Sequence, residues 1–126
     1  MRRPHRIGVS LAAVTSLLGV GLVTSSTAQA APVSAQDYAG CTTGYVCIYP
    51  DDSWNNSDPE HTYYTYGVHP LYNEYDFHRV FNNQYGGATA RLCVNSNGTD
   101  CTSKIGEYTY RDIDLTPYNS IRLDPS

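Results

Sequence analysis

The histidines are the side chains best suited to general acid and base chemistry, and they form no known motif. His61, His69 and His78 have seven and eight residues between them. Neither the H-E-x-x-H zinc motif nor the G-x-S-x-G turn that presents a nucleophilic serine occurs in the sequence. A Ser/His/Asp triad is defined by geometry rather than by spacing, so one assembled in space stays open. The sequence favours three exposed or loop histidines over a catalytic site.

Two pairs of neighbouring carboxylates could in principle divide acid and base roles at a glycosidic bond. They are Asp51 with Asp52 and Asp112 with Asp114. Cleavage of such a bond uses two carboxyl groups that flank it. Both pairs stand beside turn-forming residues in an acidic chain, which favours solvated loop charges. We therefore expect that the protein is not an enzyme and has no catalytic residues.

The first thirty residues have the pattern of a secretory signal peptide. Basic residues precede an apolar run over 7–23, and small residues follow up to Ala30, which is the order found in such peptides. The run is shorter than the roughly 20 apolar residues that cross a bilayer, so we expect cleavage rather than a retained anchor. Residues 1–30 are thus predicted to be removed, and the remaining 96 of the 126 residues to be secreted into the extracellular space.

The four cysteines all lie in the mature part, as two local pairs. Cys41 and Cys47 form one pair, and Cys93 and Cys101 form the other. In an oxidising compartment four cysteines can pair in three ways, and we expect the local pairing, in which each bridge closes a short loop. Zinc is the alternative, but its structural sites favour C-x2-C or C-x4-C spacing, which neither pair has. The sequence therefore predicts two local disulfides and no metal.

Loss of the signal peptide leaves a strongly acidic chain. Three of the eight basic residues would be removed and all twelve acidic residues would remain, which gives a net charge of −7. The remaining Arg and Lys residues are scattered, whereas proteins that bind phosphates gather them into clusters. The composition therefore argues against nucleic acids and anionic membranes as partners of the mature protein.

Short β-branched and aromatic runs, separated by Gly, Asn, Asp and Pro, dominate the mature sequence. No apolar pattern of period 3.6 continues over three helical turns. We expect an all-β domain over 41–126, with strands at 45–49, 62–66, 77–81, 88–94, 108–113 and 119–123. A single sandwich with Greek-key connections fits this spacing. Residues 31–40 have no pattern and are expected to form a loose N-terminal arm.

All twelve tyrosines lie in the mature part, and they allow two interpretations. In a small sandwich they can be core rings whose hydroxyls reach water or backbone. The rings that we expect in the core are those of Tyr63, Tyr66, Tyr108 and Tyr110. The alternative is an exposed platform for a sugar ring or a protein partner. Clusters that could form this platform are Tyr63-Tyr64-Tyr66 and Tyr72 with Tyr75.

Three features of the mature chain occur together in one known family. The first is the cysteine loop that opens at Cys41 and ends in Cys47-Ile48-Tyr49. The second is the amide and glycine turn at 82–87, with 119–123 in the corresponding place of the second half. The third is the local cysteine pair halfway along the chain. Together they resemble the small secreted βγ-crystallin-like proteins typified by the streptomycete metalloproteinase inhibitor. The resemblance implies one βγ-crystallin-like sandwich of two Greek-key motifs, and we expect a monomer.

Calcium binding depends on how far the turns match the calcium signature of the βγ-crystallins. The turn at 82–87 starts like that signature, because Asn82 and Asn83 are neighbours, but Gly86 and Gly87 stand at its hydroxyl positions. The turn at 115–120 keeps the final serine and lacks the amide pair. Calcium needs oxygen ligands, which a glycine side chain does not supply. We therefore expect no cofactor, with calcium as the alternative.

The resemblance also implies a function. In the family inhibitor the reactive bond follows the first cysteine of the second disulfide, and a valine comes next. The corresponding reactive-site loop here is Leu92, Cys93, Val94 and Asn95. A disulfide would hold this loop in a substrate-like shape and so lower the entropic cost of binding. The implied partner is an extracellular protease of the thermolysin-like metalloproteinase class. The alternative is a secreted binding or antimicrobial module without inhibitory activity.

Overall fold

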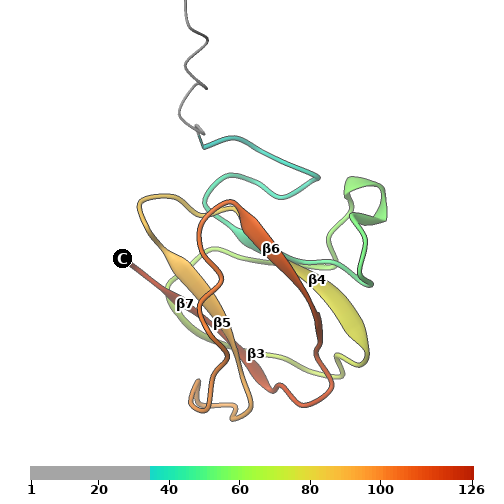
Figure 1. Ribbon diagram of the computed structural model, residues 1–126, viewed down its shortest axis with the longest axis vertical. Coiled ribbons are helices and arrows are strands. Elements are labelled where there is room, and N and C mark those ends of the chain that lie inside the picture. The colour runs from blue at the N-terminus through green and yellow to red at the C-terminus, as the bar shows by residue number, and fades with distance from the viewer. Residues whose placement is uncertain (1–34) are drawn as a thin grey trace, which may run out of the picture. The chain divides into compact units, whose positions relative to one another are not determined.

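The computed structural model describes residues 35–126, which belong to one compact unit. Its strands are β1 (Val46–Ile48), β2 (His61–Tyr63), β3 (Gly67–Pro70), β4 (Phe77–Asn82), β5 (Thr89–Cys93), β6 (Thr109–Asp114) and β7 (Ser120–Asp124). The short 3-10 turn η1 (Asn55–Ser57) is the one helical element of this part of the chain (Figure 1). The all-β prediction is therefore confirmed for these residues.

The predicted signal peptide, residues 1–30, lies outside the described residues. Within residues 35–126 no helix has the length and apolar character needed to cross a membrane.

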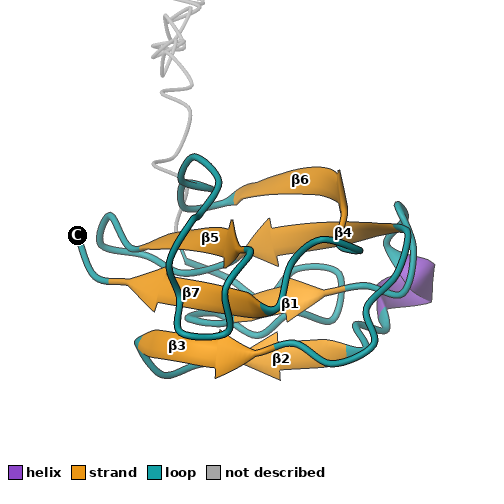
Figure 2. Cartoon of the chain, turned by 90° about the horizontal axis from the view of Figure 1, so that it is seen from below, coloured by secondary structure: helices purple, strands orange, loops and turns teal. Residues whose placement is uncertain are grey.

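The strands form two antiparallel sheets that lie face to face (Figure 1). The first has the order β2-β1-β4-β6 and the second the order β3-β7-β5. Figure 2 shows the edge strands β2 and β3 on the same side of the molecule. Although β3 follows β2 in sequence, it pairs with β7 in the second sheet, and β6 pairs with β4 in the first. The first half of the chain, β1–β4, thus adds β3 to the second sheet, and the second half, β5–β7, adds β6 to the first sheet.

The main hydrophobic core lies between the two sheets. Val46 and Ile48 of β1 and Val80 of β4 belong to one cluster with Leu92 of β5 and Ile121 of β7, and all five side chains are fully buried. Alternation along each strand sends every second side chain into this layer. Burying an aliphatic side chain of this size stabilises a fold by about 1.5–3 kcal/mol. The apolar residues of both halves therefore hold the sheets together.

A second, smaller core covers the outer face of the first sheet. Cys47 and Phe81 belong to it, together with Cys41 and Tyr49, and Trp54 packs against its edge. Because both faces of β1 are covered, all three residues of this strand are buried. This explains why the sequence of β1 is apolar throughout instead of alternating.

The described part of the arm predicted over 31–40, residues 35–40, is held in place rather than loose. Tyr38 exchanges two backbone hydrogen bonds with Cys41, at 3.0 and 2.8 Å. Its ring meets the rings of Trp54 and Phe81 edge to face, with centroids 5.2 and 5.6 Å away. This part of the arm thus contributes an aromatic ring to the outer core. The ring covers apolar surface that would otherwise be exposed to water.

Each of the six predicted strands overlaps an observed strand, but β3 was not predicted. The predicted strand at 62–66 ends at Tyr63, and a turn leads from there into β3. Gly67 and Pro70 are typical of turns, which is why the sequence gives no strand signal here. Proline lacks the N–H that a central strand needs, and it is tolerated here because β3 lies at a sheet edge.

The tyrosines divide between the two interpretations. Tyr49 is fully buried and Tyr63 partly buried, and burial raises the pKa of each hydroxyl to about 12. By contrast, Tyr66 and Tyr110 are exposed by 57% and 50%, so the core interpretation is wrong for both. The Tyr110 ring instead lies under the Arg79 guanidinium, and its centroid is 4.2 Å from the guanidinium carbon Cζ.

Candidate functional site

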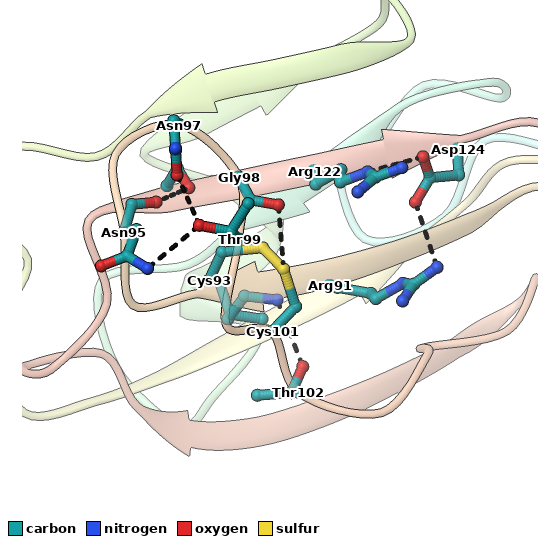
Figure 3. The surroundings of a disulfide bond; sticks show 12 residues. Arg91, Cys93, Asn95, Asn97, Gly98, Thr99, Cys101, Thr102, Arg122 and Asp124 are labelled. Carbon is teal, nitrogen blue, oxygen red and sulfur yellow. Dashed lines mark hydrogen bonds and ion pairs between the residues drawn. A yellow bond between two sulfur atoms is a disulfide. The ribbon is translucent and has the colours of Figure 1, made fainter.

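Both predicted disulfides are present. Cys41 is bonded to Cys47 and Cys93 to Cys101, and no cysteine of residues 35–126 is free. The four sulfurs therefore cannot act as thiolate nucleophiles or metal ligands. The first bridge lies in the outer core, and the second closes the hairpin that follows β5 (Figure 3).

The predicted reactive-site residues lie mostly inside the protein. Leu92 and Cys93 end β5 and are fully buried. Val94 is half-buried, and Asn95 is the one exposed residue of the four. The side chains that would have to contact a protease are therefore largely covered.

Both backbone groups of the peptide bond between Cys93 and Val94, the carbonyl and the N–H, are hydrogen-bonded within the protein. The Cys93 carbonyl accepts a hydrogen bond from the backbone N–H of Asn119 at 2.9 Å, and the Val94 N–H donates to the Asp100 carbonyl at 2.9 Å. A protease would have to open the pairing of β5 with β7 to reach this bond. The geometry argues against Cys93–Val94 as a reactive bond, and inhibition itself stays a prediction.

The exposed part of this hairpin is its tip. Asn95 donates through Nδ2 to Thr99 Oγ1 at 3.0 Å, and Thr99 Oγ1 donates to Asn97 Oδ1 at 2.6 Å (Figure 3). Gly98 has φ +77°, and a Cβ there would lie 2.4 Å from a methyl carbon of Val68. The tip is therefore closed by its own hydrogen bonds and seated against β3.

The side chains of the amide turn point into the protein. Asn82 Nδ2 donates to the carbonyls of Ala88 and Ile105 at 3.0 and 2.9 Å. Its Oδ1 accepts hydrogen bonds from the backbone N and from Nε2 of Gln84, both at 3.0 Å. Asn83 donates to two further backbone carbonyls. These amides tie neighbouring loops together and do not present a set of oxygen ligands to calcium.

We expect Asn82→Ala to lower the free energy of unfolding by about 1–3 kcal/mol, because it takes the donor from the buried Ala88 carbonyl and one of the two donors from the Ile105 carbonyl. Denaturant unfolding measures this change. Asn95→Ala serves as the control, with a change within about 0.5 kcal/mol, because the one side-chain hydrogen bond that it removes, to Thr99 Oγ1, is exposed to solvent. Equal effects of the two substitutions would contradict the role of Asn82.

Three of the four aspartates singled out in the sequence serve local structure. Asp112 accepts two hydrogen bonds from the Arg79 guanidinium, at 2.8 and 2.9 Å. Asp114 and Asp51 each accept a hydrogen bond from the backbone N–H two residues ahead, at 3.0 and 2.9 Å. The expectation that the protein is not an enzyme stays a prediction.

A pocket lined by tyrosines lies where three loops meet. Val46 of β1 is opposite Tyr63 of β2 on one side and opposite Asn82 of β4 on the other. This register brings the start of β1 and the ends of β2 and β4 to the same end of the sheet. The loops that leave these points supply the tyrosine pocket, which is lined by Gly44, Tyr64, Thr65, Tyr66, Gln84 and Tyr85.

The rings of the tyrosine pocket are accessible and surround an open space. Tyr64, Tyr66 and Tyr85 are exposed by 61%, 57% and 55%. Gly44 lies between two of them, because a Cβ there would be 3.5 Å from the Tyr64 ring and 3.6 Å from the Tyr85 ring. The hollow has a volume of about 300 Å³, at the lower end of the range for small-molecule sites.

Comparisons with protein families, curated proteins and solved structures found no match.

The tyrosine pocket is neutral. No charged side chain from residues 35–126 lines it. The polar side chains among its lining residues are those of the three tyrosines, Thr65 and Gln84. The sequence suggested a platform that included Tyr64 and Tyr66, and the structure brings these two rings together with Tyr85. Tyr85 was missed because no sequence pattern relates it to residues about twenty positions earlier.

Proposed function

We propose that the chain is a secreted binding module whose tyrosine pocket holds a neutral carbohydrate. The observation that carries the proposal is the set of three exposed phenol rings around an uncharged hollow. The C–H face of a sugar ring packs on an aromatic face, and tyrosine hydroxyls exchange hydrogen bonds with sugar hydroxyls. Tyrosine also gives rigid contact area at low entropic cost.

The shape and charge of the tyrosine pocket support a sugar over other occupants. A charged ligand would call for a side chain of opposite charge, and none lines the pocket. Protein partners are usually met by broad surfaces of about 800 Å² on each side, whereas this site is a small hollow. A sugar unit of a longer glycan fits such a site.

We expect Tyr85→Ala to weaken carbohydrate binding at least tenfold, which corresponds to about 1.4 kcal/mol. The substitution removes one wall of the pocket, and Tyr85 makes no side-chain hydrogen bond in residues 35–126 on which the fold depends. Calorimetric titration with neutral cello-, xylo- and chito-oligosaccharides provides the measurement. Tyr85→Phe keeps the ring and separates its contribution from that of the hydroxyl.

The matched control is Tyr72→Ala, because Tyr72 is 76% exposed and lies outside the tyrosine pocket. Binding should be unchanged in this variant. Equal losses in Tyr72→Ala and Tyr85→Ala, or no binding of any oligosaccharide by the parent protein, would overturn the proposal.

We further infer that the fold is a βγ-crystallin-like sandwich of two Greek-key motifs. The exchange of β3 and β6 between the sheets supports this assignment, since each half gives one strand to the other half's sheet. Secretion is supported by the two disulfides, which persist in oxidising compartments. The expected monomeric state is tested by light scattering of the mature protein.

Protease inhibition is the second candidate function. The disulfide-closed hairpin favours it, because its exposed tip is held in one shape by internal hydrogen bonds. Contact with a protease would then involve the tip at 95–100 rather than the Cys93–Val94 bond. An inhibition assay of the oxidised protein against a thermolysin-like metalloprotease decides this, and absence of inhibition removes the candidate.

A further inference from the structure

We propose that Glu60, His61 and Glu74 form a binding site for a divalent transition metal of the zinc type. One side-chain nitrogen or oxygen of each residue lies within 4.8 Å of the others. His61 Nε2 lies 2.6 Å from Glu74 Oε1. None of the three residues lines the tyrosine pocket, so this site is independent of the proposed function.

Two separate segments bring these side chains together. Glu60 and His61 stand at the start of β2, where the Glu60 N–H donates to the Ile48 carbonyl of β1 at 2.8 Å. Glu74 comes from the loop between β3 and β4. His61 is opposite Ile48 in the register of the first sheet. The sheet therefore fixes two of the proposed ligands, and the loop carries the third to them.

The buried His78 side chain contacts the carboxylates of both Glu60 and Glu74. Its Nδ1 lies 3.0 Å from Glu60 Oε1 and its Nε2 lies 3.5 Å from Glu74 Oε2. The same nitrogens lie 2.7 and 2.9 Å from the carbonyl oxygens of Tyr49 and Tyr75. Because both nitrogens face oxygen acceptors, His78 serves as a hydrogen-bond donor and not as a ligand. Such partners orient the ligands of known metal sites.

In residues 35–126 the ion-pair partners of the two carboxylates, Glu60 and Glu74, are histidines, and none is Lys or Arg. The Glu74 side chain is only 7% exposed. A cation between the two carboxylates would relieve this concentration of negative charge.

The ligand types favour zinc over calcium or magnesium. Calcium and magnesium take oxygen ligands, whereas imidazole nitrogen suits zinc and its neighbours in the transition series. Zinc–ligand distances of about 2.0–2.2 Å place tetrahedral ligands about 3.4 Å apart. The three side chains reach that spacing with shifts of about an ångström, and the His61 side chain is 45% exposed and able to move. Water would complete the coordination.

The test is calorimetric titration of the tag-free, oxidised protein with ZnCl₂. We expect one zinc ion per chain, and at least tenfold weaker binding in His61→Ala and in Glu74→Gln. His69→Ala is the matched control, because His69 hydrogen-bonds to the Thr65 carbonyl and lies outside the three-residue group. Its zinc affinity should stay within twofold of the parent.

Two further measurements guard against misfolded variants and non-specific binding. Circular dichroism should show that His61→Ala keeps the parent's fold. CaCl₂ in place of ZnCl₂ should bind at least a hundredfold more weakly. The proposal is overturned if the parent does not bind zinc, or if His61→Ala and His69→Ala bind it equally well.

Discussion

Reduction of both disulfides should unfold most of the protein at room temperature. The bridges span six and eight residues along the chain, and on the chain-entropy model each contributes about 2–3 kcal/mol. The total of about 5 kcal/mol is comparable with the whole stability of many small domains, about 5–15 kcal/mol. Guanidinium unfolding with and without a reductant measures the loss, with circular dichroism as the probe.

The two bridges can be compared through paired serine variants. Replacing Cys41 and Cys47 should cost more than replacing Cys93 and Cys101, because both residues of the first pair are fully buried while Cys101 is half-buried. A reduced protein that stays folded with an unchanged denaturation midpoint would contradict this account of its stability.

Gly40→Ala should destabilise the protein by about 3 kcal/mol or more. Gly40 has φ +76°, a conformation that costs other residues about 1–2 kcal/mol. A Cβ at this position would also lie 1.9 Å from the Ser57 carbonyl oxygen. This overlap is with backbone, so the segment before Cys41 or the η1 turn would have to move. Denaturant unfolding of the variant gives the free-energy change.

Gly86→Ala separates the cost of the positive-φ backbone conformation from the cost of the overlap with Ser57. Gly86 has a similar φ of +71°, but no atom lies within 4 Å of the Cβ that alanine would add. It should therefore show the cost of backbone conformation alone, about 1–2 kcal/mol. If Gly40→Ala costs no more than Gly86→Ala, the close packing of Gly40 against Ser57 is wrong.

Strands with a clear apolar or aromatic run could be predicted from the sequence, because such runs fit a half-buried pleated surface. The β1, β4 and β7 segments belong to this group. What the sequence could not reveal was β3, where Gly67 and Pro70 resemble a turn and the pairing with β7 is set by a segment more than fifty residues away. The packing of Tyr38 on the outer core also depends on distant residues.

Functional positions were harder to predict than strands. The disulfides followed from local spacing and are confirmed. The tyrosine pocket joins three loops that the register of the first sheet brings to one end, and the group of Glu60, His61 and Glu74 likewise joins distant segments. Neither grouping has a signature in the linear sequence, because strand pairing creates both.

Chemical-shift mapping tests the central claim, that the tyrosine pocket holds a neutral carbohydrate. The uniformly ¹⁵N-labelled protein would be titrated with the same cello-, xylo- and chito-oligosaccharides. The account predicts that at least one of them shifts the backbone amides of Gly44, Thr65 and Tyr85, while the amides at 95–100 stay in place. Shifts confined to 95–100, or no shift with any of the oligosaccharides, would contradict it.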